Sequence, residues 1–348
     1  MSLLCLGAWL PSPPVVVFAD GCRLPRSAFS STLKLFPRSS LRGAHFMAFL
    51  FRALSRLPLA SLYHVFGVVG WLTFRVFRWR HALASSNVAR AFPERSVAER
   101  EAILAQSYRN LADLLAEIVW SFRAKPEEIT ARCAVANPEL IGEHIRAGRS
   151  VLLLTAHFCN WEWQILAGNL QVGVPVNPIY KPQRVAGIDR FLRAARSRFG
   201  GEPIPHKELM RELLRRRREP RVYAMVADQT PTPDEPKHWT RFLNEDSAFF
   251  VGPDVVARAA RAAALFVDVE RIGRGRYRMR LVPLAEPPYP KGVDVGLVER
   301  YARALETEIR RAPADWLWVH RKWKYGRPEG SGVLPGEAIR TPDPPPGA

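Results

Sequence analysis

One short segment of the sequence combines residue types suited to proton transfer. It reads Leu154-Thr-Ala-His-Phe-Cys-Asn-Trp-Glu162, with an imidazole at His157 and a carboxylate at Glu162. A carboxylate that holds one imidazole nitrogen fixes the tautomer and leaves the other nitrogen free to act as a base. The sequence contains no G-x-S-x-G nucleophile elbow, so we predict that this dyad deprotonates a substrate hydroxyl directly, with Glu162 orienting His157.

The spacing of the dyad restricts where its two residues can lie. The apolar run Val151–Thr155 predicts a buried strand, and His157 follows it by two residues. Five residues on one continuous helix turn through about 500°, which would place His157 and Glu162 on different faces. We therefore expect His157 in the turn and Glu162 in the first helical turn, with Asn160 as the N-cap. Cys159 is interpreted as core packing.

The elements around this segment alternate in type, which predicts an α/β fold with a central, largely parallel sheet flanked by helices. Catalytic side chains in such sheets gather at the carboxyl ends of strands. A helix over 94–125 is expected to begin with a Ser96–Glu99 capping box. The predicted strands are 151–155, 176–180, 222–226, 265–271 and 277–284, and the predicted helices are 161–170, 188–198, 207–218, 252–264 and 297–312.

The segment 57–74 is largely apolar and has arginines on both sides. A bilayer-spanning helix needs about 20 apolar residues, so this segment is at the lower limit of length. Arginines at both ends fit a helix that lies in one leaflet and attracts anionic lipid. We predict that residues 47–80 form an N-terminal membrane-anchoring helix; a buried core helix is the alternative.

Charge and composition narrow the class of partner. The 348 residues include 51 Lys and Arg against 33 Asp and Glu, a formal net charge of +18. Such a balance favours an anionic partner: nucleic acid, anionic lipid or an acidic carrier protein. Four scattered cysteines give neither a zinc pattern nor a disulfide framework. His206, His238 and His320 lack paired ligand spacing, so we predict no metal and no cofactor.

The division of the chain into segments and a set of substrate-binding residues are also predicted from the sequence. Residues 1–46 are expected to be a disordered tail or an extension upstream of a start at Met47. We predict that the catalytic domain covers 81–328 and that 329–348 is a disordered tail.

Polar residues follow two of the predicted strands. After the second strand come Lys181, Arg184 and Asp189, and after the third come Asp228 and Gln229. These five residues are predicted to bind substrate, together with Asn160 and Arg321. Arg321, Lys322 and Lys324 alternate with Trp316, Trp318 and Trp323, which indicates contact with lipid headgroups or an edge strand.

Ordered blocks along the chain resemble the bacterial lipid A biosynthesis acyltransferases of the lauroyl and myristoyl type, which are lysophospholipid-acyltransferase-like. The match begins with Gly148–Glu162 and continues with Ile179-Tyr-Lys-Pro182 and Asp189, Ala227-Asp-Gln229 and the block 312–324. Together they cover roughly residues 48–328. Lys181 stands where the family usually has Arg, and a lysine cannot make a bidentate contact. The Pro-rich stretch 230–239 also departs from the Tyr-Gly continuation common in the family.

The resemblance implies transfer of a fatty acyl chain from an acyl carrier protein to a hydroxyl of a lipid A precursor glycolipid. It also implies the cytoplasmic face of the inner membrane, with anionic lipids as partners and no nucleic acid. His157 would be the general base and Glu162 its partner. The alternatives are acylation of another membrane lipid (a phospholipid, an aminolipid or a mannosylated phosphoinositide), a lipid hydrolase that uses the same dyad, and a basic nucleic-acid-binding protein.

Overall fold

A seven-stranded sheet organises the part of the chain that the computed structural model describes, which is residues 51–183, 185–290 and 296–328. The strand order is β1-β9-β8-β2-β5-β3-β4, and every neighbouring pair is parallel except β8–β9. The strands are β1 (Cys133–Val135), β2 (Val151–Thr155), β3 (Val176–Tyr180), β4 (Ile204–Pro205), β5 (Val222–Val226), β8 (Ala263–Gly273) and β9 (Arg276–Ala285). The predicted fold class is confirmed. The expectations for 1–46 and 329–348 lie outside the described residues.

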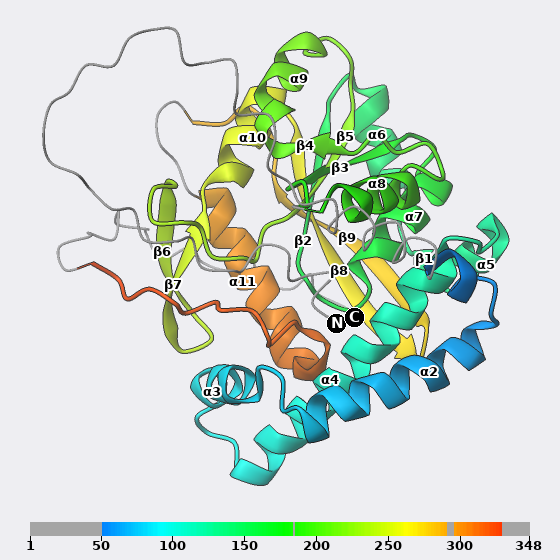
Figure 1. Ribbon diagram of the computed structural model, residues 1–348. Helices are drawn as coiled ribbons and strands as arrows, with labels where there is room; N and C mark the ends of the chain where they lie inside the picture. The colour runs from blue at the N-terminus through cyan, green and yellow to red at the C-terminus, as the bar shows by residue number, and fades with distance from the viewer. Residues whose placement is uncertain (1–50, 184, 291–295, 329–348) are drawn as a thin grey trace, which may run out of the picture.

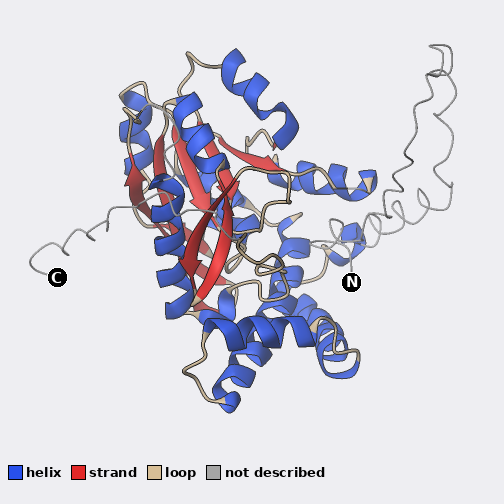
Figure 2. Cartoon of the chain, turned by 90° about the vertical axis from the view of Figure 1, so that its left-hand side faces the viewer, coloured by secondary structure: helices blue, strands red, loops and turns tan. Residues whose placement is uncertain are grey.

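Helices cover both faces of this sheet (Figures 1 and 2). In Figure 1, α6, α7 and α8 lie on one side of the strands, and α9, α10 and α11 lie on the other. A second group, α2, α3 and α4, packs together at one end of the sheet. The helices are α2 (Leu59–Trp71), α3 (His81–Ala91), α4 (Val97–Ser121), α5 (Pro126–Thr130), α6 (Glu139–Arg146), α7 (Trp161–Gln171), α8 (Ala186–Arg196), α9 (Leu209–Arg215), α10 (Gly252–Ala260) and α11 (Gly296–Arg311).

The central strand β2 has helices on both sides and is therefore apolar at almost every position. All five residues of β2 are buried, between β5 on one side and β8 on the other. A fully buried Leu or Val contributes roughly 1.5–3 kcal/mol, so this strand is a rigid base for the turn that follows it. At its end, the Thr155 carbonyl accepts hydrogen bonds from the Tyr301 hydroxyl (2.8 Å) and the Ala227 amide (3.1 Å).

Several predicted boundaries agree with the structure, and several elements were missed. The Ser96–Glu99 capping box is present, with both reciprocal bonds. The helix expected over 207–218 is shorter, because it begins with a 3₁₀ turn and ends at Arg215. The pattern did not reveal the helices α3, α5 and α6, the short strands β1 and β4, or the hairpin of β6 (Lys237–Phe242) and β7 (Glu245–Phe250). Most of these elements are short, and the hairpin alternates polar and apolar residues only weakly.

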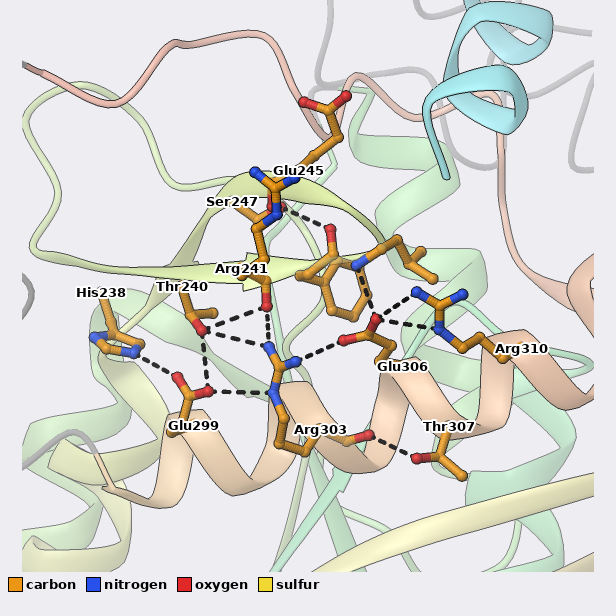
Figure 3. Close-up of polar contacts among 12 residues, drawn as sticks. His238, Thr240, Arg241, Glu245, Ser247, Glu299, Arg303, Glu306, Thr307 and Arg310 are labelled. Carbon is orange, nitrogen blue, oxygen red and sulfur yellow. Dashed lines mark hydrogen bonds and ion pairs between the residues drawn. The ribbon is translucent and has the colours of Figure 1, made fainter. Parts of the chain in front are cut away.

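Polar contacts attach the β6–β7 hairpin to α11 (Figure 3). The Glu299 carboxylate accepts from the Thr240 hydroxyl and pairs with His238 at 2.8 Å. Arg303 pairs with both Glu299 and Glu306. The hairpin also reaches α3 through a 2.6 Å ion pair between Arg90 and Glu245. These contacts fix the hairpin, and with it the chain that leaves the carboxyl end of β5.

The apolar segment predicted as an anchor forms α2 and a continuing π-helical turn, η1 (Leu72–Val76). Within the described chain, Leu59–Val76 is the one helix whose 18 residues are long and apolar enough to cross a membrane, and only 11% of it is buried. One face packs on α4, so closely that a Cβ on Gly70 would lie 2.7 Å from the Cβ of Ala112. The opposite face exposes apolar side chains: Val65, Val68, Trp71, Leu72, Val76 and Phe77.

One buried polar side chain in α6 has no partner among the described residues. His144 is 4% exposed, and neither ring nitrogen has a hydrogen bond. An unsatisfied buried polar group costs roughly 1–3 kcal/mol. We therefore expect His144→Leu to raise the free energy of unfolding by about 1–3 kcal/mol. Urea denaturation followed by circular dichroism measures this, with His64→Leu on the exposed face of α2 as the control. A loss of stability in His144→Leu would contradict it.

Candidate active site

The imidazole of His157 is held by a carboxylate that comes from the neighbouring strand. His157 lies in the turn after β2, and Asp228 lies just beyond β5, which pairs with β2. The Nδ1 atom of His157 is 2.7 Å from Asp228 Oδ1. The backbone N–H of His157 donates to the other oxygen, Oδ2, at 3.1 Å. One carboxylate therefore fixes both the ring and the backbone of His157.

The second ring nitrogen of His157, Nε2, is the acceptor end of this pair. An ionised carboxylate only accepts hydrogen bonds, so Nδ1 carries the proton and Nε2 carries the lone pair. The amide Nε2 of Gln229 lies 3.3 Å from His157 Nε2. The side chain of His157 is 16% exposed, against 3% for Asp228, and its ring packs edge-on against Trp161 at 4.9 Å. Of this pair, His157 is therefore the member that a substrate can reach.

The electrostatics of Asp228 favour the ionised carboxylate. Burial alone would raise its pKa, but the electrostatic interaction with His157 and hydrogen bonds from His157 and Trp316 hold the pKa well below its ordinary value. The Trp316 indole N–H donates to Oδ2 at 2.9 Å. The Lys322 ammonium donates to the Asp228 carbonyl at 2.9 Å and to the Ala248 carbonyl at 3.1 Å. Burial lowers the pKa of Lys322 to about 7.

The C-terminal segment holds the other side of the His157 turn. Phe158 and Trp316 form an antiparallel bridge, flanked by bonds from the Leu317 amide to the His157 carbonyl and from the Cys159 amide to the Asp315 carbonyl. Trp316, Trp318 and Lys322 are buried, so the expectation that this block meets headgroups or forms an edge strand is wrong for these three residues. Arg321 is exposed and stays available to an anion.

The predicted contact between His157 and Glu162 is corrected by the structure. As expected, α7 begins at Trp161 with Asn160 as its N-cap and Glu162 in its first turn. The Glu162 carboxylate, however, accepts two hydrogen bonds from the guanidinium of Arg196, at 2.8 and 2.6 Å. Both oxygens of this carboxylate are therefore used by Arg196, while the Nδ1 atom of His157 pairs with Asp228. Asp228 therefore takes the orienting contact that was assigned to Glu162.

Asn160 is a second correction, because its side chain is 1% exposed and cannot face a substrate. Its Oδ1 accepts from the Trp163 amide at 2.9 Å, which caps α7, and its Nδ2 donates to Glu117 at 2.7 Å. Both ends of the side-chain amide are therefore used within the protein. The Asp228 carboxylate is likewise occupied by His157 and Trp316, so it is a partner of the imidazole instead of a substrate ligand.

The remaining predicted residues occupy different positions. Gln229 lies next to the His157 ring. Lys181 is exposed at the end of β3, while the Asp189 carboxylate accepts from the Gln183 amide at 2.8 Å and so shapes the loop after β3. Arg184 lies outside the described residues. Cys159 is buried, with φ +50°, and burial raises the pKa of its thiol well above the ordinary value, which fits the interpretation as core.

Sequence reasoning missed Arg196 and Trp316 as parts of this site. Arg196 ends α8, and no spacing rule connects it with a residue 34 positions earlier. Trp316 belonged to a block that had been singled out, but its indole contact with Asp228 depends on the fold. The signal for Asp228 was available, because it also follows a buried strand and carboxyl ends of parallel strands share one edge.

The Glu162–Arg196 pair gives a test that separates the two possible partners of His157. Each member is nearly buried, with 10% and 14% of its side chain exposed. We expect Glu162→Gln and Arg196→Gln to lower kcat by similar factors, and the double variant to lose no more than the larger single, because contacting residues couple by about 0.5–3 kcal/mol. Steady-state kinetics of the four proteins measure this. A large loss in Glu162→Gln with normal kcat in Arg196→Gln would restore Glu162 as the partner of His157.

The class of enzyme follows from the geometry and from comparisons with known proteins. An imidazole held by a carboxylate at the carboxyl edge of an α/β sheet, next to a thiol whose pKa is raised by burial, suits direct activation of a hydroxyl. A model of the family described as bacterial lipid A biosynthesis acyltransferase matches residues 32–325. The chain is 25% identical over 283 residues to a lipid A biosynthesis palmitoleoyltransferase of Escherichia coli, covering 80% of this chain and 90% of that protein.

Two further relatives agree with this match. A lipid A biosynthesis lauroyltransferase of Escherichia coli is 26% identical over 286 residues, covering 79% of this chain and 89% of that protein. A lipid A biosynthesis acyltransferase of Haemophilus influenzae is 21% identical over 247 residues, covering 68% of this chain and 73% of that protein. The chain belongs to the bacterial lipid A biosynthesis acyltransferase family. It is an acyltransferase of lipid A biosynthesis, which implies a glycolipid acceptor.

Proposed function

We propose that the protein transfers a fatty acyl chain from an acyl carrier protein thioester to a hydroxyl of a lipid A precursor, with His157 as the general base. The observation that carries this proposal is the Asp228-bound imidazole of His157, whose side chain is partly exposed and whose Nε2 is the acceptor nitrogen. The acceptor hydroxyl gives its proton to Nε2 while its oxygen attacks the thioester carbon. Collapse of the tetrahedral oxyanion breaks the C–S bond, and the thiol leaves with the proton from His157.

Charge and hydrogen bonding around His157 support the rest of the step. The Gln229 amide lies 3.3 Å from Nε2 and can donate a hydrogen bond to the oxyanion as it forms. Such a donor typically increases the rate by roughly 10²–10³. Lys181 and Arg321 are both exposed cations, suited to phosphate groups of the acceptor or to the thioester oxygen. The imidazolium formed during the step is stabilised by the ionised Asp228.

The proposed location is the cytoplasmic face of the inner membrane, where acyl carrier protein is available. The exposed face of α2 and η1 presents Val68 (60% exposed), Trp71 (59%) and Phe77 (75%). Arg75 and Arg78 are exposed beside them. Because the other face packs on α4, we propose that α2 lies in the interface of one leaflet, where the arginines meet anionic headgroups.

Mass spectrometry of lipids from a deletion strain tests the acceptor. We expect lipid A that lacks one acyl chain, restored by the wild-type gene and not by the His157→Ala gene. Unchanged lipid A with a chain missing from a phospholipid, an aminolipid or a mannosylated phosphoinositide would overturn the proposed acceptor and name the true one.

A purified assay tests the donor and the reaction type. Wild-type protein in detergent micelles receives radiolabelled acyl-acyl carrier protein or acyl-coenzyme A, with a lipid A precursor. We expect labelled glycolipid from the carrier-protein donor, at a rate well above that from coenzyme A. Free fatty acid without labelled glycolipid would identify a hydrolase instead.

A further inference from the structure

A buried carboxylate outside the catalytic pair lies between the membrane-facing helix and the histidine turn. Glu117 belongs to α4 and is 0% exposed. Its Oε1 accepts from the Tyr63 hydroxyl at 2.8 Å, and its Oε2 accepts from Asn160 Nδ2 at 2.7 Å and from the Tyr277 hydroxyl at 2.8 Å. These donors come from α2, from the N-cap of α7 and from β9. Glu117 therefore joins three elements that are far apart in the sequence.

On the α2 side of Glu117, close contacts hold the Tyr63 side chain in place. The Arg274 guanidinium lies 4.1 Å from the centre of the Tyr63 ring and forms two bonds with Asp113, at 2.8 and 2.5 Å. Gly275 has φ +63°, and a Cβ there would collide with the Tyr63 hydroxyl. The tight turn between β8 and β9 therefore closes on Tyr63 and leaves its hydroxyl directed at Glu117.

The active-site side of the network begins only three residues after His157. Asn160 can cap α7 only when its amide oxygen points at the Trp163 amide, which leaves its NH₂ directed at Glu117. The Trp163 indole N–H also donates to the Glu117 carbonyl, at 3.1 Å. The intervening Cys159 has φ +50°, a conformation that non-glycine residues adopt only where their surroundings enforce it. Glu117 thus supports the side of the His157 turn that the C-terminal segment does not.

A contribution to stability alone does not explain why a glutamate occupies position 117. Burial raises the pKa of Glu117, against the opposing effect of its hydrogen bonds and of Arg271. Burying such a group is costly unless every lone pair is satisfied, and an apolar residue of similar volume is often as stable. A carboxylate at this place does, however, fix the direction of two separate donors, Tyr63 and Asn160, which an apolar residue cannot do.

We propose that Glu117 is a positioning residue that links α2, through Tyr63, to the Asn160 cap and so fixes the turn that carries His157. This inference rests on the proposed function in one respect, which is the role of His157 as the base. Transfer then depends on how α2 is seated, because a shift of α2 reaches the turn through two hydrogen bonds. A misplacement of a reacting group by about 1 Å can cost on the order of 10² in rate.

Two mild substitutions test each side of the link. Asn160→Ser keeps an oxygen that can cap α7 but removes the NH₂ that reaches Glu117, and Tyr63→Phe removes the hydroxyl on the α2 side. We expect each to lower kcat by roughly tenfold or more with KM for donor and acceptor unchanged, since the base moves while substrate contacts remain. In the double variant, we expect kcat to decrease by a factor well below the product of the two single-variant factors, because both substitutions act through Glu117.

Tyr108→Phe is the matched control. Tyr108 lies in the same helix as Glu117, and its buried hydroxyl donates to the Trp79 carbonyl at 2.8 Å without touching Glu117. The Tyr108→Phe variant should lose about as much free energy of unfolding as Asn160→Ser and Tyr63→Phe do, with kcat unchanged. If Asn160→Ser and Tyr63→Phe behave like Tyr108→Phe, Glu117 is only structural. If their losses multiply, the two residues act independently and the link is wrong.

Hydrogen exchange measured by mass spectrometry gives a readout that does not depend on activity. We expect faster exchange in a peptide spanning residues 157–163 in Tyr63→Phe than in wild type, and no change in Tyr108→Phe. Unchanged exchange in Tyr63→Phe would overturn the link, even for a protein whose lipid substrate differs from the proposed one. An absence of transfer by the wild-type protein would count against the proposed function and leave this comparison intact.

Discussion

His157→Ala should lower kcat by roughly 10²–10⁴, the contribution that a positioned general base usually makes. The loss should appear in kcat with little change in KM for the lipid acceptor, because the imidazole acts on the proton that moves in the transition state. The variant should remain folded, since the ring is partly exposed and its main contact is with Asp228. Transfer from acyl carrier protein to a lipid A precursor, followed by thin-layer chromatography, measures the effect.

His206→Ala is a suitable control for this experiment, because His206 is exposed on the short turn before α9. It should keep wild-type kcat. Near-normal transfer by His157→Ala would show that another group deprotonates the acceptor hydroxyl, and the proposed mechanism would then be wrong.

Asp228→Asn should have an effect of comparable size, about 10²–10⁴ in kcat. An asparagine at this position can offer its NH₂ to Nδ1, which moves the imidazole proton to Nε2 and removes the lone pair from the reacting side. The same change of carboxylate to amide in a Ser-His-Asp triad costs about 10⁴ through the wrong tautomer. The variant also loses an ionic acceptor for the backbone amide of His157 and for the Trp316 indole.

The control for Asp228→Asn is Asp234→Asn, six positions later in an exposed part of the loop. It should leave kcat unchanged. Nitrogen-15 NMR of labelled histidine adds a direct test, since the tautomer of His157 should differ between wild type and Asp228→Asn. An unchanged tautomer with full activity would remove Asp228 from the mechanism, whatever the result for Glu162.

The fold could be predicted in outline because hydrophobic patterning is local. The run Val151–Thr155 is continuously apolar, since a central strand is covered on both faces, and that pattern is legible without the structure. The capping box at Ser96 and the cap at Asn160 were also predicted correctly, because their bonds join residues only three apart. The β6–β7 hairpin was missed, because its position depends on contacts with α11 and α3 that lie about 60 and 150 residues away.

The candidate site shows the same division. His157 and its place after a strand were evident from the sequence, and so was Asp228 as a residue at the same sheet edge. The identity of the partner was not, because proximity along the chain favoured Glu162, five residues away. In the folded protein, β2 and β5 lie side by side and bring Asp228 within 2.7 Å of the ring, while α7 directs Glu162 toward Arg196.

By itself, the sequence determined the class of fold, the position of His157 in the turn after its strand and the apolar amino-terminal helix, all of which depend on residues close together in the chain. Only the tertiary structure decided which carboxylate holds His157 and that Glu162 pairs with Arg196. It also decided that Lys322 is buried and that Glu117 joins α2 to the turn. The physical reason is that hydrogen bonds between side chains require contact within about 3 Å, and for distant residues that contact is set by strand order and helix packing.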